Sequence, residues 1–177
     1  MKFETECIGK DLESMGVYCG CPKCNPVPKI TDEQKAEQDK IRNEQIVEQD
    51  KKTKIKQEHK LKVGDLFETS WGYDQTNYEY IVVIEISPSG KTAICKRTSY
   101  ETIDDNEQSP QAYKQKPINK PFGEIFRLKV DKRYNNEISL RGSYPFLHTG
   151  EGSKRLGSFS LVLENEVFYE TNPIFGH

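Results

Sequence analysis

The chain has 177 residues, of which 31% are charged, and its formal net charge is -2. This length suits one sizeable domain, or a smaller domain with an appendage. No apolar run approaches the roughly 20 residues of a membrane helix, and the N-terminus lacks the apolar core of a signal peptide. We therefore expect no membrane partner and a cytoplasmic location, where cysteines serve as thiols or metal ligands rather than as disulfides.

A cluster of cysteines marks residues 1–30, namely Cys7, Cys19, Cys21 and Cys24. Structural zinc takes four ligands and favours thiolates. The segment has too few apolar residues for a core of its own, and metal binding would supply its folding energy. We therefore predict a structural zinc knuckle at residues 1–30. Free thiols, or a redox pair at Cys21 and Cys24, are the alternatives.

Residues 31–60 contain no Gly, no Pro and no aromatic residue. Thr31 with Gln34 three positions later fits a capping box, in which the two side chains bond each other's backbone amides. Apolar residues are too few for the heptad seam of a strong coiled coil. We predict a charged, solvated helix that ends in a basic run at Lys51–Lys56.

From Leu61 onward the apolar residues recur with the period of two that is typical of strands. Pro88–Lys91, "PSGK", indicates a hairpin turn. Cys95 lies inside an apolar strand, where a thiol behaves as a small hydrophobic group. The predicted strands are residues 62–71, 78–87, 92–102, 124–130, 136–140, 158–164 and 166–171.

Between the third and fourth predicted strands, residues 103–123 read as a long polar loop. Pro110, Pro117 and Pro121 lie in it, and connections of this length are usually functional or disordered. Short strands with turn signals and no second helical pattern indicate a small barrel or sandwich. We predict a mainly β fold for residues 61–177: an SH3-like or similar β-barrel of about 6 or 7 strands.

The stretch Trp71–Asn77, "WGYDQTN", places aromatic and polar side chains between two predicted strands. In one interpretation these residues only build the loop, since Gly72 permits an unusual backbone angle and short polar side chains bond neighbouring amides. In the other, an aromatic ring stacks on a ligand and the polar groups read it. The candidate binding residues are Trp71, Tyr73, Asp74, Gln75 and Asn77.

Charge is distributed unevenly over the predicted β region. Residues 65–109 hold nine acidic and three basic side chains, whereas residues 110–155 hold ten basic and four acidic ones. The halves either neutralise each other across the fold or leave a basic face that attracts an anionic partner. The candidate contacts of such a face are Arg127, Lys129, Arg141, Lys154 and Arg155.

Gly64–Val83, "GDLFETSWGYDQTNYEYIVV", resembles a family of small uncharacterised proteins encoded by phages, prophages and plasmids. These share Trp-Gly-Tyr-Asp/Glu-Gln-Thr-Asn between two strands, and the likeness extends over about residues 61–160, through "SGKTAICKR", "EIFRLKV" and "NEISL". The family commonly has Phe-Tyr where Tyr80 and Ile81 stand, and residues 1–60 lie outside the match. The resemblance implies an accessory protein of a mobile element with a small β-fold in the host cell, and it implies no activity.

Motifs of catalysis are few. There is no His-x-x-x-His, no Gly-x-Ser-x-Gly and no phosphate-binding glycine loop, and Asp74 with His148 is the one acid–base pair we consider. We therefore expect a non-enzymatic binding module that recognises nucleic acid, or a nucleic-acid-bound host complex, through the Trp71–Asn77 loop and the basic face. The alternatives are a protein–protein inhibitor or assembly factor acting through the charged helix, and a small hydrolase or transferase using Asp74 and His148.

Overall fold

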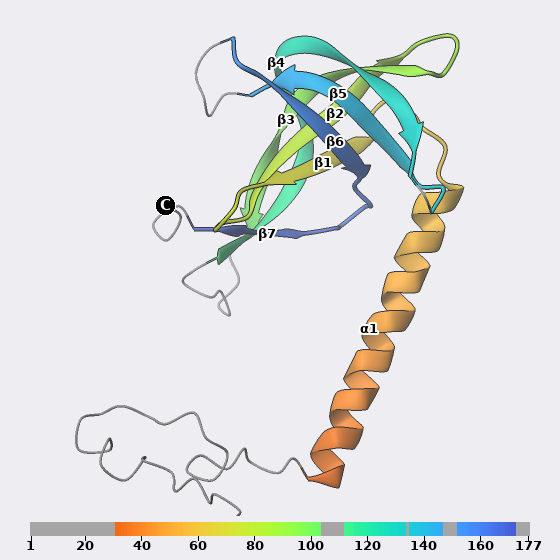
Figure 1. Cartoon of the computed structure of the whole chain (residues 1–177), viewed down its shortest axis with the longest axis vertical. Helices are drawn as coiled ribbons and strands as arrows, with labels where there is room; N and C mark the ends of the chain where they lie inside the picture. Colours follow the sequence, from red (N-terminus) through yellow and green to blue (C-terminus); the bar gives the residue numbers. More distant parts are fainter. Residues whose placement is uncertain (1–30, 104–111, 134, 147–151, 173–177) are drawn as a thin grey trace, which may run out of the picture. The chain divides into compact units, whose positions relative to one another are not determined.

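The computed structural model describes residues 31–103, 112–133, 135–146 and 152–172. One helix precedes seven strands (Figure 1), which confirms the prediction of a mainly β protein with an N-terminal helix. Contacts between Cα atoms divide the chain into two units at Val47 and Glu48, so the predicted boundaries at residues 30 and 60 stay predictions. No helix in the described ranges is long and apolar enough to span a membrane.

The helix α1 (Asp32–Glu58) confirms the predicted charged helix, and no residue in it is buried. Its first turn holds the predicted capping box. The amide of Thr31 donates to Gln34 Oε1 at 3.1 Å, and the amide of Gln34 donates to Thr31 Oγ1 at 3.2 Å. An ion pair between Glu48 and Lys52 at 2.8 Å follows the favourable spacing of four residues. Local interactions of this kind, rather than burial, favour the helical conformation.

The seven strands form one antiparallel sheet. They are β1 (Leu66–Trp71), β2 (Asn77–Ile86), β3 (Thr92–Ile103), β4 (Ala112–Lys132), β5 (Ile138–Pro145), β6 (Lys154–Leu161) and β7 (Phe168–Thr171). Their order is β3-β2-β1-β6-β5-β4-β7, and a further pairing of β3 with β4 joins two strands that this order places far apart. All seven predicted strands are confirmed. Strands β2 and β3 start or end one residue outside the predicted bounds, and β4, β5 and β6 do so by more.

The predicted loop at residues 103–123 is wrong from Ala112 onward, because β4 begins there. Pro117 pairs with Tyr100 of β3, and Pro121 pairs with Thr98. Proline cannot donate a ladder hydrogen bond and is tolerated at bulges. The register of β3 and β4 shifts between Thr98 and Tyr100, so the two prolines lie where the ladder is interrupted. Pro110 lies outside the described residues.

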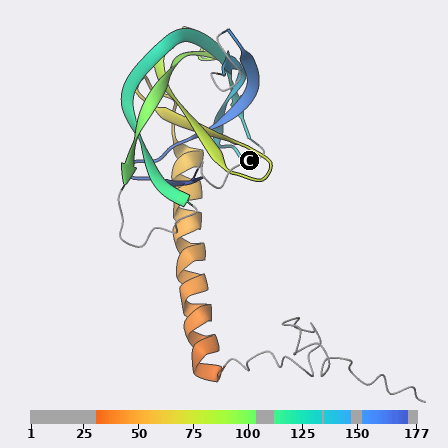
Figure 2. The ribbon, with the colours of Figure 1, turned by 90° about the vertical axis from the view of Figure 1, so that its left-hand side faces the viewer.

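Strand β4 has 21 residues, and this length allows it to pair with three other strands. Residues 112–115 pair with β7, residues from 114 to 129 pair with β3, and residues 129–132 pair with β5. Figure 2 shows the curvature of β4, which follows a wide arc. Gly123 has a φ of 73°, a value open to glycine at little cost, and it lies where the register with β3 shifts between Phe122 and Phe126.

The hydrophobic core is built from one face of β1 to β6. Its buried members are Phe67, Ile81, Val83, Ala93, Cys95, Leu128, Ile138, Leu140, Tyr144, Phe146, Phe159 and Leu161. Cys95 is fully buried, as predicted, and burial raises the pKa of its thiol to about 12. A protonated, enclosed thiol is a packing group rather than a reactive one.

A second apolar cluster covers the other face of β2. Tyr78 stacks on Tyr80 with ring centroids 6.2 Å apart, and Tyr80 contacts Tyr100 of β3 at 5.9 Å and Phe168 of β7 at 5.6 Å. The Tyr80 hydroxyl donates to Gln115 Oε1 at 3.1 Å. Burial raises the pKa of Tyr80. We call these four rings the tyrosine cluster; it explains why β2 is buried on both sides.

Glu68 of β1 provides a pH-dependent prediction. Burial raises the pKa of its carboxyl, and a hydrogen bond with Ser160 lowers the pKa by a smaller amount. A raised folded-state pKa stabilises the fold below the unfolded-state pKa, and this contribution is lost as pH rises through the folded-state value. Glu68→Gln is therefore expected to raise the free energy of unfolding at neutral pH and to flatten its decline above pH 4, measured by urea unfolding. The exposed Glu124→Gln is the matched control, and identical pH profiles for wild type and Glu68→Gln contradict the prediction.

Candidate functional site

The "WGYDQTN" motif forms the connection of the β1–β2 hairpin. Trp71 and Asn77 are the last paired residues of the two strands. Gly72 has a φ of 129°, and the side-chain amide of Asn77 donates to the carbonyl of Trp71 at 3.4 Å. Gly72 and Asn77 therefore shape the loop, as the structural interpretation of the motif predicts.

The second half of the loop is attached to β7. The amide of Thr76 donates to Thr171 Oγ1 at 2.9 Å, and the amide of Thr171 donates to the carbonyl of Thr76 at 2.9 Å. Two reciprocal hydrogen bonds to a strand 95 residues away in sequence hold this side of the loop in one position.

Trp71 is partly buried and packs against the hydrophobic core. Its ring meets Phe146 edge-on at 5.1 Å, and the Arg155 guanidinium lies 5.6 Å from the Trp71 ring and 5.1 Å from the Phe146 ring. Arginine over an aromatic face is a cation–π contact. By contrast, Tyr73 is 100% exposed and Asp74 is exposed. Trp71 thus anchors the loop, whereas Tyr73 and Asp74 are presented to solvent.

Gly72→Ala tests this division of roles. A Cβ at position 72 would lie 1.8 Å from the carbonyl oxygen of Gln75, and φ values of this kind are strained for any residue with a side chain. The variant is expected to lose about 1–3 kcal/mol of stability, measured by urea unfolding followed by Trp71 fluorescence. Gly90→Ala, in the next hairpin, combines a positive φ of 68° with open space around the added Cβ, and it should lose less. Equal losses in both variants contradict the close packing at Gly72.

The predicted basic residues gather on β4, β5 and β6. Lys129 pairs with Arg141, Arg141 with Ser158, and Pro145 with Lys154. Cross-strand partners and residues two apart along a strand share one face of a sheet. Four predicted residues therefore lie on the same outward, exposed face, which we call the basic face: Arg127, Lys129, Arg141 and Lys154.

The fifth predicted basic residue, Arg155, does not lie on the basic face. It neighbours Lys154 in β6 but pairs with the buried Tyr144, and its guanidinium lies over Trp71 and Phe146. The structure therefore joins Arg155 to the loop motif and separates it from the basic face. Asp131 lies 3.9 Å from Lys129 and 4.0 Å from Arg141, so one carboxylate partly offsets the cations of the basic face.

Other predicted site residues cannot be placed. His148, the proposed partner of Asp74, and the zinc ligands Cys7, Cys19, Cys21 and Cys24 lie outside the described residues. Within the described ranges, no group of three or more His, Cys, Asp or Glu side chains could hold a metal ion. The zinc knuckle and the acid–base pair stay predictions.

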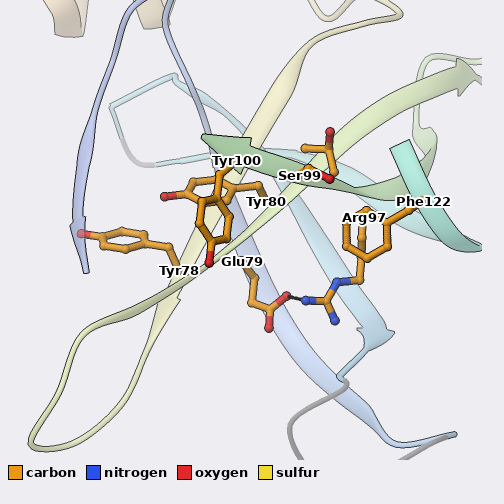
Figure 3. Close-up of a pocket in the computed structure, with 8 residues that line it drawn as sticks. Tyr78, Glu79, Tyr80, Arg97, Ser99, Tyr100 and Phe122 are labelled. Atoms are coloured by element: carbon orange, nitrogen blue, oxygen red, sulfur yellow. Dashed lines mark ion pairs between the residues drawn. The ribbon is translucent and has the colours of Figure 1, made fainter. Parts of the chain in front are cut away.

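The structure also shows a pocket that the sequence interpretation missed. It has a volume of about 180 Å³ and lies between β2 and β3, and we call it the β2–β3 pocket (Figure 3). Its lining residues are Tyr78, Glu79, Tyr80, Arg97, Thr98, Ser99, Tyr100 and Phe122. Glu79 and Arg97 form an ion pair at its base, with side chains 1% and 13% exposed. A signal existed in the sequence, since a Glu stands within the apolar run of β2 and an Arg within β3.

Comparisons of the chain with protein-family models, with curated proteins and with solved structures found no match. The loop, the basic face and the β2–β3 pocket are therefore the features from which a function can be inferred.

Proposed function

We propose that the chain is a non-enzymatic nucleic-acid-binding accessory protein of a phage or another mobile element, acting in the cytoplasm of the host cell. The single observation that carries the proposal is the basic face, on which four long cationic side chains extend into solvent from three neighbouring strands. We further propose that β1 to β6 form a small SH3-like or similar barrel, with β4 pairing with β3 to close it.

The arrangement of Lys129 and Arg141 supports an anionic partner. They are direct cross-strand neighbours with side chains 72% and 62% exposed. Like charges placed directly opposite each other destabilise a sheet. Asp131 offsets only part of this repulsion, because one carboxylate lies near two cations, and phosphate groups would reduce it further. Neighbouring strands are about 4.8 Å apart and alternate residues about 6.7 Å apart, a spacing that allows several phosphates of one chain to be contacted at once.

Tyr73 supplies the aromatic element of the proposed interface. Its ring is fully exposed at the tip of a loop that Trp71 and Thr76 hold in place, and exposed rings on fixed supports stack on bases without sequence preference. The resemblance of Gly64–Val83 to proteins of phages and plasmids supports the origin in a mobile element. The host-complex form of the hypothesis uses the same surface, with nucleic acid already bound to a host protein.

Binding across a salt series tests the proposal. Fluorescence anisotropy of a labelled oligothymidylate of about 12 nucleotides and of a short duplex is followed from about 50 to 300 mM NaCl. Four phosphate contacts predict a slope of log K against log salt of roughly -3 for the single strand and nearer -4 for the duplex. Absence of binding to either nucleic acid at the lowest salt contradicts the proposal.

The helix α1 favours a second candidate, a protein–protein inhibitor or assembly factor. None of its 27 residues is buried, and four apolar side chains on it are about half exposed: Ile41, Ile46, Val47 and Ile55. A helix whose apolar side chains are this exposed is suited to a partner's groove. If neither nucleic acid binds at low salt, this candidate becomes the better account of the chain.

A further inference from the structure

We propose that the β2–β3 pocket binds one unstacked guanine base of a single-stranded nucleic acid. The inference rests on the proposed nucleic-acid-binding function and gives it a base preference. It begins with the pairing of the strands. The β2–β3 ladder ends at Ile81 and Arg97. Beyond it, Glu79 continues in the ladder with β1 and Thr98 in the ladder with β4. The two strands separate there, and the pocket lies at their separation.

The floor of the pocket is a guanidinium with unused donors. One nitrogen of Arg97, Nη2, pairs with Glu79. Its Nε and Nη1 are enclosed, and neither has a hydrogen-bond partner among the residues that the structure describes. A buried donor without a partner is unfavourable and calls for a physical reason, and a buried ion pair is weak support for stability. An acceptor atom that enters the pocket would satisfy the guanidinium.

Aromatic rings form the walls. Figure 3 shows Tyr78, Tyr80 and Tyr100 on one side of the pocket and Phe122 beside Arg97 on the other. The Arg97 guanidinium lies 5.7 Å from the centroid of the Phe122 ring. Tyr100 and Phe122 are 42% and 40% exposed, so both rings are available at the rim. Rings of this kind stack on bases.

The size of the pocket limits its occupant. A volume of about 180 Å³ is below the roughly 300–1,000 Å³ of sites for drug-sized ligands. One ring system therefore fits, and the sugar and phosphate remain outside. Two cationic residues lie near the pocket. The backbone amide of Lys120 donates to Thr98 Oγ1 at 3.0 Å, and the Lys120 side chain is exposed. Arg127 of the basic face pairs with Ile94 on β3. A single strand can thus pass from the basic face to the pocket.

Guanine matches the floor better than the other bases do. Its O6 and N7 lie on one edge of the base and accept two hydrogen bonds from one guanidinium. Arg97 presents such a guanidinium, and the Glu79 carboxylate holds it through Nη2. Adenine places an amine beside N7, a pattern read by amide side chains, and thymine offers a single acceptor in place of the O6 and N7 pair.

The test compares a labelled oligothymidylate of about 12 nucleotides with the same oligomer carrying one central guanine, at low salt. Wild type is expected to bind the guanine-bearing oligomer on the order of tenfold more tightly. Tyr100→Ala should remove that preference while retaining affinity for oligothymidylate. Tyr169→Ala, on β7 and 56% exposed, removes an exposed tyrosine outside the pocket and should retain both.

A second measurement does not depend on any variant. The Nε–H resonance of Arg97 in the NMR spectrum is expected to shift with the guanine-bearing oligomer and to stay in place with oligothymidylate. Equal affinities together with an unmoved Arg97 resonance overturn the pocket proposal and leave the proposed function standing. Loss of binding to both oligomers overturns the proposed function as well, so the two failures are distinguishable.

Discussion

Joint replacement of Arg127, Lys129 and Arg141 by glutamine is expected to weaken binding to oligothymidylate at about 50 mM NaCl by roughly two orders of magnitude or more. Each phosphate contact that is lost removes the release of about 0.7 counterion from a single strand, and this release is most favourable at low salt. The slope of log K against log salt should therefore fall by about 2. Fluorescence anisotropy across the salt series measures both quantities.

The matched control removes three cations from another part of the chain. Lys35, Lys40 and Arg42 are exposed residues in the first half of α1, and their replacement by glutamine changes the net charge by the same amount. This variant is expected to retain most of the affinity and the full slope. Equal weakening in the two variants would show that net charge, rather than the basic face, attracts the nucleic acid. Far-UV circular dichroism checks that both variants remain folded.

Local patterns were sufficient for most of the secondary structure. The capping residues of α1 and the apolar run of β2 are properties of neighbouring residues, and the predicted capping box and strand are both confirmed. The first half of β4 was missed because Pro117 and Pro121 indicate a loop locally. Their tolerance depends on bulges in the pairing with β3, which is a tertiary property that no local pattern contains.

The sequence predicts which kinds of residue the candidate site contains, but not which of them share one face of the sheet. The sequence shows an excess of cations in residues 110–155, but adjacent residues of a strand point to opposite faces, so the register decides which of them cooperate. Lys154 joins the basic face, whereas its neighbour Arg155 packs over Trp71. A register shift of one residue would reverse this assignment.

The same limit applies to the β2–β3 pocket. Glu79 and Arg97 are separated by a hairpin, and nothing in the sequence links Glu79 of β2 to Arg97 of β3, which directly follows Lys96. Their meeting depends on the pairing of Ile81 with Arg97 and on the separation of the strands beyond that pair. Buried charges in apolar strands are therefore the signal that could have directed attention to this pocket.

Glu79→Leu is expected to destabilise the fold by about 3–5 kcal/mol, because it leaves the Arg97 charge buried without its carboxylate. The Glu79 side chain is 1% exposed and the Arg97 side chain 13%, so water compensates neither charge well. Urea unfolding measures the loss. The partly exposed pair of Lys56 and Glu166 provides the comparison: Glu166→Leu breaks an ion pair nearer to solvent and should cost less.

The double variant Glu79→Leu/Arg97→Met separates the stability of the pair from its role in recognition. Replacement of a buried ion pair by apolar side chains of similar volume is often neutral or stabilising, so the double variant is expected to recover most of the stability that Glu79→Leu loses. It should bind oligothymidylate as wild type does, since the basic face is intact, and it should lose the preference for the guanine-bearing oligomer. Failure to recover stability would show that the pair is required for the fold itself. Recovery with the guanine preference retained would show that the base is recognised elsewhere.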